Sequence, residues 1–301
     1  MKKILYLIPL LLMATACDWF EFDNMDGYDA TITGQFIDAA TNQPVLFGVP
    51  DSYSFTIYEQ EGSFTPAKGT FTPTAQTWYA KTDGSYTNKL VFSGSYRIQA
   101  QTNNFYPLTE EFTIAKGNNT KNFSVTPYAR VKDVKISYDS ANKQLVAKFK
   151  AEHGDATKTN GINAYFLIAP DRFVGKNHNN ATDATAVASA VEPGEEIELR
   201  ISTAGGNNSE FQYTQPHYVR VAVMGAYGAV QPAYDEPQYD IWSWYMAGMP
   251  ADMTPYITGY VHHDAAFAPN GTVNPNAMYN YSPVYKVSED FSTFTEVTDW
   301  D

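Results

Sequence analysis

The sequence predicts an all-β protein made of two β-sandwiches. Apolar and polar residues alternate in short runs, as in residues 30–38, where Ile32, Gly34 and Phe36 fall on one face of a strand. Gly, Asn, Asp and Pro interrupt these runs roughly every 8 to 12 residues, which is typical of sandwiches. A helical period is almost absent. With 301 residues, the chain is long enough for two domains, each with its own core.

The first sandwich is expected over residues 28–127, with about seven strands. Asp83 and Gly84 form a hairpin dipeptide, because both central residues of a type I′ turn adopt positive φ. Pro127 marks the end of the domain, since it cannot donate to a strand ladder and biases Thr126 toward extended geometry. Further strands are expected in four runs: 53–60, 77–102, 112–115 and 122–128.

The second sandwich is expected over residues 128–301, and its pattern resembles an immunoglobulin or fibronectin type III domain. Residues 171–193 lack a strand pattern, and two alternatives stay open for residues 182–193, a short helix or a loop. Residues 232–276 are rich in Pro, Gly, Tyr and Trp, and we expect a long loop inserted before the last strand. Strands are expected at 129–139, 143–152, 162–170, 195–203, 217–228 and within 278–297.

The N-terminus reads as a secretion signal over residues 1–16. Two lysines precede an apolar run of ten residues, which is shorter than the roughly 20 residues that a membrane span needs. Cys17, the only cysteine, directly follows three small residues and cannot form an internal disulfide. The ending resembles a bacterial lipobox, which implies a lipid on Cys17. The alternative is an ordinary signal peptide followed by a stray cysteine.

Residues 17–27 form an acidic linker in a chain of net charge −13. An acidic surface argues against nucleic acid and anionic headgroups as partners, and it suits a neutral partner such as a glycan. An acidic stretch after a lipidated cysteine resembles the surface-export signal of Bacteroidota lipoproteins, and a plain solvated linker is the alternative. We therefore expect a protein anchored by its lipid to the outer membrane and exposed at the cell surface.

Five stretches together resemble a known family, and they are ITGQFIDAATNQPV, KTDGSYTNKLVFSGSYRI, NFSVTPYARV, YVRVAVMG and YNYSPVYKV. The chain is similar to two-domain lipoproteins of unknown function from gut Bacteroidota, whose genes lie beside SusC-like transporters and SusD-like binders in polysaccharide utilisation loci. The resemblance implies a transthyretin-like (carboxypeptidase-regulatory-like) sandwich followed by an immunoglobulin-like one. It also implies a role in polysaccharide capture, with no active-site motif to transfer.

The sequence offers one candidate glycan platform, inside the insertion. Sugars present C–H faces that stack on aromatic rings and hydroxyls that pair with polar side chains. Trp242 and Trp244 are two residues apart, so they would share a face of an extended segment. The alternative is that these rings plug the end of a sandwich. The candidate residues are Trp242, Trp244, Tyr245, Asp240, Tyr256 and Tyr260.

Catalysis, cofactors and metals are not expected. HExxH, GxSxG, P-loop and GxGxxG motifs are absent from the sequence. His262 and Asp264 could share one face of a strand, but two ligands are a weak metal signal. Acidic neighbours such as Glu195-Glu196 and Glu110-Glu111 do not show the facing geometry of a glycosidase pair.

Two functional hypotheses follow. The first is a non-catalytic glycan-binding accessory lipoprotein of a polysaccharide uptake system, which holds oligosaccharide near a transporter. The second is a structural or assembly lipoprotein that contacts a SusC/SusD-like transporter through sheet edges without binding sugar. Exposed tryptophans at 242 and 244 would favour the first hypothesis, and burial of both would favour the second.

Overall fold

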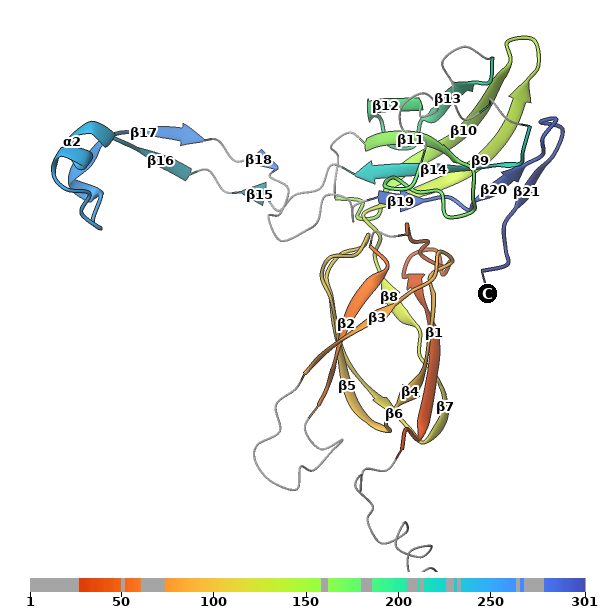
Figure 1. Ribbon diagram of the computed structural model, residues 1–301, viewed down its shortest axis with the longest axis horizontal. Helices are drawn as coiled ribbons and strands as arrows, with labels where there is room; N and C mark the ends of the chain where they lie inside the picture. Colours follow the sequence, from red (N-terminus) through yellow and green to blue (C-terminus); the bar gives the residue numbers. More distant parts are fainter. Residues whose placement is uncertain are drawn as a thin grey trace, which may run out of the picture.

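The computed structural model confirms an all-β protein with several packed sheets (Figure 1). The predicted signal, Cys17 and all but the last residue of the acidic linker lie outside the described residues. In the described part, no helix combines the length and the apolar character that crossing a membrane requires. The structure describes residues 27–49, 52–60, 74–157, 162–179, 186–204, 211, 214–225, 230–231, 234–263, 266–267 and 279–300.

The first sandwich contains two sheets of four strands each. One sheet has the order β4–β1–β7, with β8 also pairing with β1, and the other has the order β3–β2–β5–β6. Strand β1 pairs antiparallel with β4 and parallel with β7 and β8. The strands are β1 (Ala30–Asp38), β2 (Ser54–Glu59), β3 (Ala75–Tyr79), β4 (Ser85–Val91), β5 (Gly94–Ala100), β6 (Leu108–Ile114), β7 (Gly117–Thr120) and β8 (Phe123–Val125).

Aromatic rings fill the core of the first sandwich. Phe36 is fully buried on β1, and its ring lies 5.0 Å from that of Phe55 and 5.2 Å from that of Phe105. Aromatic pairs at these separations add to the free energy gained by burial alone. Position 34 on the same strand requires glycine, because a Cβ there would lie 1.7 Å from the Lys121 carbonyl oxygen. The alternation read in residues 30–38 therefore builds this core.

The chain turns at Asp83-Gly84, but the predicted type I′ hairpin is wrong, because Asp83 does not share the positive φ of Gly84 and the turn does not close a hairpin. Gly84 has a φ of +80°, and its N–H donates to the Lys81 carbonyl at 3.0 Å. A single bridge, Ala80 to Tyr86, joins the two sides. The flanking strands β3 and β4 belong to different sheets, so the turn carries the chain across the sandwich.

The second sandwich packs a three-stranded sheet, β13–β10–β9, against a larger sheet. The larger sheet has the order β12–β11–β14–β20–β21, and β19 also pairs with β14. Residues 182–193, for which the sequence left a helix or a loop as alternatives, instead contain an edge strand, β12, which pairs with β11. The strands are β9 (Ala129–Asp139), β10 (Gln144–His153), β11 (Ile162–Ala169), β12 (Ala186–Val191), β13 (Glu196–Ser202), β14 (His217–Gly225), β19 (Tyr279–Tyr281), β20 (Tyr285–Val287) and β21 (Phe294–Glu296).

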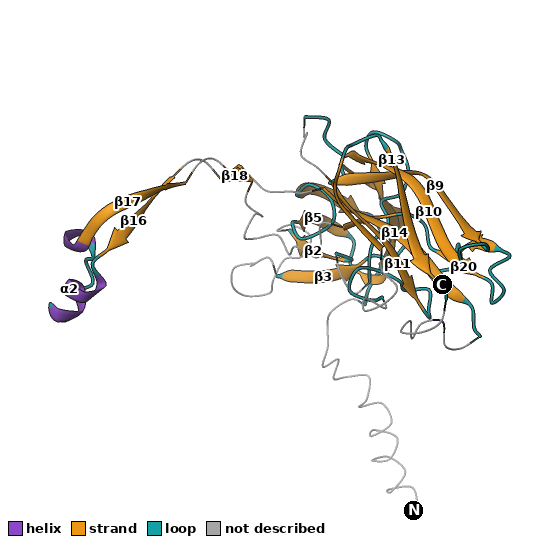
Figure 2. Cartoon of the chain, turned by 90° about the horizontal axis from the view of Figure 1, so that it is seen from above, coloured by secondary structure: helices purple, strands orange, loops and turns teal. Residues whose placement is uncertain are grey.

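The predicted loop insertion at 232–276 is wrong as a loop, because most of its described residues form a hairpin that we call the arm. Antiparallel ladders join its strands in pairs, and a helix and a 3-10 turn close its tip. Figures 1 and 2 show the arm projecting away from both sandwiches. Its elements are β15 (Val230–Gln231), β16 (Tyr234–Tyr239), α2 (Ile241–Met246), η3 (Thr254–Tyr256), β17 (Ile257–His263) and β18 (Ala266–Phe267).

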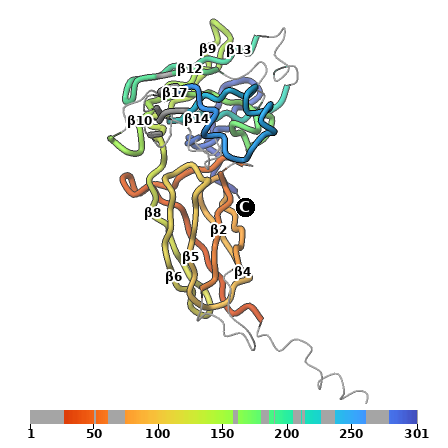
Figure 3. Tube along the Cα trace, turned by 90° about the vertical axis from the view of Figure 1, so that its left-hand side faces the viewer, coloured from red at the N-terminus to blue at the C-terminus, as the bar shows by residue number. Residues whose placement is uncertain are grey.

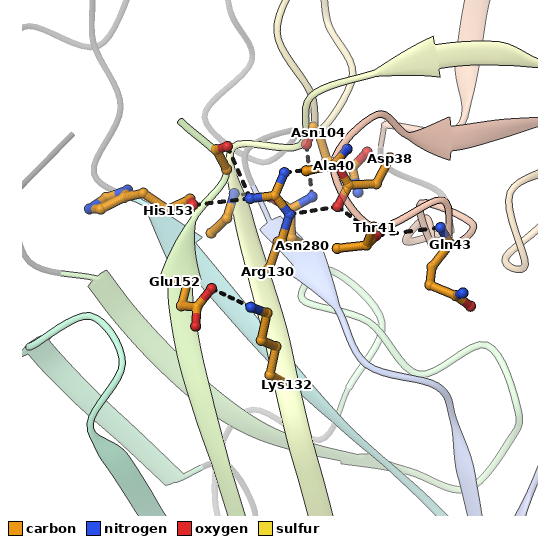
Figure 4. Close-up of polar contacts among 12 residues, drawn as sticks. Asp38, Ala40, Thr41, Gln43, Asn104, Arg130, Lys132, Glu152, His153 and Asn280 are labelled. Carbon is orange, nitrogen blue, oxygen red and sulfur yellow. Dashed lines mark hydrogen bonds and ion pairs between the residues drawn. The ribbon is translucent and has the colours of Figure 1, made fainter. Parts of the chain in front are cut away.

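The two sandwiches stand end to end in Figures 1 and 3, and Pro127 lies between the last strand of one and the first strand of the other. A charged pair crosses this junction (Figure 4). The guanidinium of Arg130 donates to both carboxylate oxygens of Asp38, at 2.5 and 2.8 Å. Burial by itself would raise the pKa of Asp38, but hydrogen bonds from Arg130, the Ala40 N–H and Thr41 lower it below its usual value.

Two buried asparagines complete the junction. The Asn280 amide donates to the Asn104 carbonyl at 2.8 Å and accepts from the Ala129 N–H at 2.9 Å. The Asn104 amide in turn donates to the carbonyls of Leu46 and Tyr279, at 2.8 and 3.1 Å. Both side chains are almost fully buried. Hydrogen-bonded buried amides of this kind hold two surfaces in one orientation.

Candidate functional sites

The tip of the arm is organised by one capping residue. Asp240 accepts hydrogen bonds from the backbone N–H and the hydroxyl of Ser243, at 3.0 and 2.5 Å. These bonds lower the pKa of Asp240 and satisfy a free N–H of the first turn of α2. The Asp240 N–H also donates to the Tyr256 carbonyl at 2.8 Å, which ties α2 to η3. Gly248 follows the helix with a φ of +84°.

Trp242 and Tyr245 form an exposed aromatic pair on α2. Their ring centroids lie 6.1 Å apart and the planes are inclined by 30°. They are three residues apart, a spacing that places two side chains on the same face of a helix. The side chains are 71% and 57% exposed, and neither residue belongs to a core cluster. This pair offers the flat, accessible surface that a sugar ring stacks on.

The predicted pairing of Trp242 with Trp244 is wrong. It assumed an extended segment, but residues two apart on a helix point about 200° apart. Trp244 is half-buried, and its indole N–H donates to the Pro250 carbonyl at 2.9 Å. Asp240 before the helix and Gly248 after it were the local signals that could have predicted α2.

The remaining predicted residues lie beside the tip with different exposures. Tyr256 is half-buried at the end of η3. Tyr260 is exposed further along β17, opposite Pro237 of β16. The tip also exposes aliphatic and thioether side chains, namely Ile241, Met246 and Met249. The aromatic pair therefore sits within a wider apolar surface.

A second candidate site lies at the junction of the two sandwiches. A cavity of about 410 Å³ is lined by the first sandwich at Gln35 and Asp83 and by the second at Arg220, Glu296 and Trp300. We call it the junction cavity. No motif in the sequence could have found it, because its walls come from both domains and from the last residues described.

Arg220 is the most deeply buried charge at the junction cavity, with 1% of its surface exposed. Its Nε donates to the Ser282 carbonyl at 2.7 Å and its Nη1 to the Phe47 carbonyl at 2.8 Å. The guanidinium lies 4.2 Å from the centroid of the Tyr281 ring. Burial lowers the pKa of Arg220 to about 9, so the group stays charged at neutral pH.

The described residues hold no group of three or more His, Cys, Asp or Glu side chains that could bind a metal ion. His262 lies on β17, and Asp264 falls outside the described residues. Glu110 forms an ion pair with Lys121. The pair Glu195-Glu196 straddles the start of β13, where alternate residues point to opposite faces. The Glu195 and Glu196 side chains are exposed and the Glu110 side chain is half-buried, as expected for carboxylates at the surface.

The fold defines a two-sandwich protein with an added arm, and comparison with known proteins gives its relations. Residues 30–126, which span the first sandwich, match a family described as "Protein of unknown function (DUF3823) N-terminal domain". Among curated proteins, none matches the chain.

Several solved structures share the fold. One is a "putative carbohydrate binding protein" from Bacteroides uniformis, 23% identical, with a TM-score of 0.60 over 87% of this chain and all of that one. A DUF3823 family protein from the same species is 14% identical, with a TM-score of 0.56 over 87% of this chain and 99% of that one. Another, from Parabacteroides merdae, is 19% identical, with a TM-score of 0.52 over 66% and 92%. The match of the first sandwich to a family of unknown function and the structural neighbours from these bacteria agree with that part of the resemblance noted in the sequence.

Proposed function

We propose that the protein is a non-catalytic, glycan-binding accessory lipoprotein of a polysaccharide uptake system. Its two sandwiches would form the body of the molecule, and the arm would present the binding surface. Lipidation at Cys17 would hold the chain on the outer membrane with the arm free to reach polymer outside the cell. A SusC/SusD-like transporter would take up the captured oligosaccharide.

The exposed stack of Trp242 on Tyr245 is the observation that carries this proposal. Single exposed rings are common, but Trp242 and Tyr245 lie beside other exposed apolar side chains at the tip, and a contiguous exposed apolar patch commonly marks a binding surface. Stacking on a sugar would cover both rings and leave the sugar hydroxyls free to pair with nearby polar groups. The B. uniformis structure named as a "putative carbohydrate binding protein" has the same fold, which also supports the proposal.

Affinity electrophoresis tests the proposal directly. The full chain would be solubilised in a detergent without a sugar headgroup and run through gels that contain one plant or host polysaccharide each. We expect at least one polysaccharide to retard the protein. Tyr245→Ala and Trp242→Ala should abolish most of that retardation, because each removes half of the stack.

Tyr79→Ala is the matched control, since Tyr79 is a 56% exposed tyrosine on the first sandwich, close to the 57% of Tyr245. It should leave retardation unchanged. If no polysaccharide slows the wild-type protein, or if Tyr79→Ala weakens retardation as much as Tyr245→Ala, the aromatic pair is not a glycan platform.

The second candidate is an assembly lipoprotein that binds a transporter and no sugar. The apolar side chains of Ile241, Met246 and Met249 at the tip favour this alternative, because flexible thioethers suit protein contacts. Here Met246→Asp should release the protein from a detergent-solubilised transporter complex in a pull-down while glycan retardation stays absent in the wild type. Retention of Met246→Asp in the complex would argue against this function.

The anchor has a separate test. Mass spectrometry of the N-terminal peptide from membranes should show an acylated Cys17 as the first residue. Cys17→Ala should move the protein from the membrane fraction to the soluble fraction, because acyl chains supply about 0.8 kcal/mol for each buried methylene. An unmodified thiol at Cys17 would rule out the lipid anchor.

A further inference from the structure

The junction cavity has the size and the position of a ligand site. Its volume of about 410 Å³ falls within the roughly 300–1,000 Å³ typical of small-molecule pockets. Both sandwiches line it, and the chain after β21 forms one wall. Figure 1 shows this last segment running down from β21 toward the first sandwich. Pockets between domains are a common place for ligands.

An aromatic ring in this wall is held in position. Trp300 is half-buried, and its ring centroid lies 6.4 Å from that of Phe173. The guanidinium of Arg172 lies 5.8 Å from the Trp300 ring and donates to the Asp299 carbonyl at 2.8 Å. A ring fixed in this way loses little conformational entropy on binding, which favours stacking on a ligand.

Polar groups of both kinds line the same cavity. Asp83 and Glu296 bring carboxylate acceptors, while the Gln35 and Gln43 amides can donate and accept. Arg220 also lines the cavity, and its buried Nη2 has no hydrogen-bond partner among the described residues. A buried donor of this kind is normally satisfied by a water or by a ligand oxygen. One stacking ring with several placed donors and acceptors is the composition that recognises sugar hydroxyls.

The charges of the cavity decide between neutral and acidic sugars. Among the described residues that line the cavity, Arg220 is the one cation and Asp83 and Glu296 are anions, while the Arg172 guanidinium lies against Trp300 outside the lining. The carboxylates of Asp83 and Glu296 disfavour a negatively charged uronic acid or phosphate, and they accept hydrogen bonds from sugar hydroxyl groups. We infer that the junction cavity is a second binding site, which takes one neutral saccharide unit between Trp300 and the carboxylates of Asp83 and Glu296. It extends the proposed glycan binding but is physically separate from the arm.

Saturation-transfer NMR on the full-length protein, in a detergent without a sugar headgroup, tests this site. The probes are free glucose, galactose, mannose, xylose and rhamnose, with glucuronic acid as the charged comparison. At least one neutral sugar should receive saturation. Trp300→Ala should weaken its binding about tenfold. Glu296→Gln should weaken binding several-fold. Because it keeps the shape of an exposed side chain, it tests the site even if Trp300→Ala fails to fold.

Two control variants separate this inference from the proposed function. Trp242→Ala should keep sugar binding at the cavity while losing polysaccharide retardation at the arm. Glu289→Gln, a surface carboxylate outside the cavity lining, should change neither. The inference is overturned if no neutral sugar is saturated, if only glucuronic acid is, or if Trp242→Ala removes the signal while Trp300→Ala and Glu296→Gln leave it intact.

Discussion

At the scale of single residues, the junction depends on groups whose hydrogen-bonding geometry no other side chain reproduces. Arg220 reaches carbonyls on two different segments, Phe47 in the first sandwich and Ser282 in the second. A planar fork can do this, whereas a lysine ammonium is a single point. Gly48 lies next to the same contact, because a Cβ there would come within 2.6 Å of the Tyr281 hydroxyl.

We therefore expect Arg220→Lys to be strongly destabilising although the charge is kept. Two buried carbonyls would lose their donors, which should lower the free energy of unfolding by about 2–4 kcal/mol. Urea unfolding followed by fluorescence measures the change. Arg200→Lys, on a more exposed surface pair, is the control and should shift stability by less than about 0.5 kcal/mol. Equal effects of the two variants would refute a special role for Arg220.

The Asp38–Arg130 pair gives a prediction with a pH dependence. Asp38→Asn should cost about 3 kcal/mol at pH 7, because it leaves a half-buried guanidinium without its counter-charge. The folded pKa of Asp38 is lower than its ordinary value, so its contribution to stability is present above about pH 4 and is lost as the pH falls through the folded pKa.

The difference in stability between wild type and Asp38→Asn should therefore shrink as the pH falls below about 4 toward the acid limit of folding. Urea titrations at several pH values measure it as a difference, which cancels most effects of the other carboxylates. A gap that stays constant below pH 4 would show that the ionised carboxylate does not stabilise the junction.

At the scale of elements, the strands of the arm and the strands of the sandwiches differ in what they bury. The sandwich strands bury one face, and their alternation is visible in burial along β13, where Ile197, Leu199 and Ile201 face inward. The arm strands pair only with one another among the described elements, and the described arm residues are absent from the core clusters. The described aromatic residues of the arm therefore do not contribute to the cores of the two sandwiches.

We expect the two sandwiches to stay folded when the arm is removed. Replacing residues 234–263 by a short Gly-Ser linker should move the melting temperature by no more than about 3 °C, since surface changes away from the core alter stability little. Scanning calorimetry measures this. Ile197→Ala, one core residue on β13, should by contrast lower stability by about 2–5 kcal/mol. A large drop in melting temperature on arm removal would mean that the arm braces a sandwich.

At the scale of the whole molecule, buried polar contacts join the two sandwiches into one body. Asn104 and Asn280 are 176 residues apart in sequence, yet each satisfies a backbone group of the opposite domain. Breaking such a contact leaves buried groups unpaired, which costs more than the hydrogen bond contributed. The domains are thus expected to unfold together.

Asn280→Ala tests this coupling. It would leave the buried Ala129 N–H without its partner and would remove one of the two donors of the Asn104 backbone carbonyl, which keeps the Tyr128 N–H. The expected loss is about 1–3 kcal/mol. Calorimetry should show one transition for the wild type and a broadened or split transition for the variant. Asn142→Ala, in the exposed turn between β9 and β10, should keep the single transition. Two transitions in the wild type would show that the sandwiches are independent.

The sequence by itself determined the all-β class and the positions of most strands, because period-two alternation is read from near neighbours. It also carried the capping residues Asp240 and Gly248, which the expectation of an extended segment overlooked. Only the tertiary structure decided which aromatic rings meet at the tip, since a helix turned Trp244 away and brought Tyr245 to Trp242. It alone created the junction cavity, because residues from Gln35 to Trp300 line that space only once the two sandwiches dock.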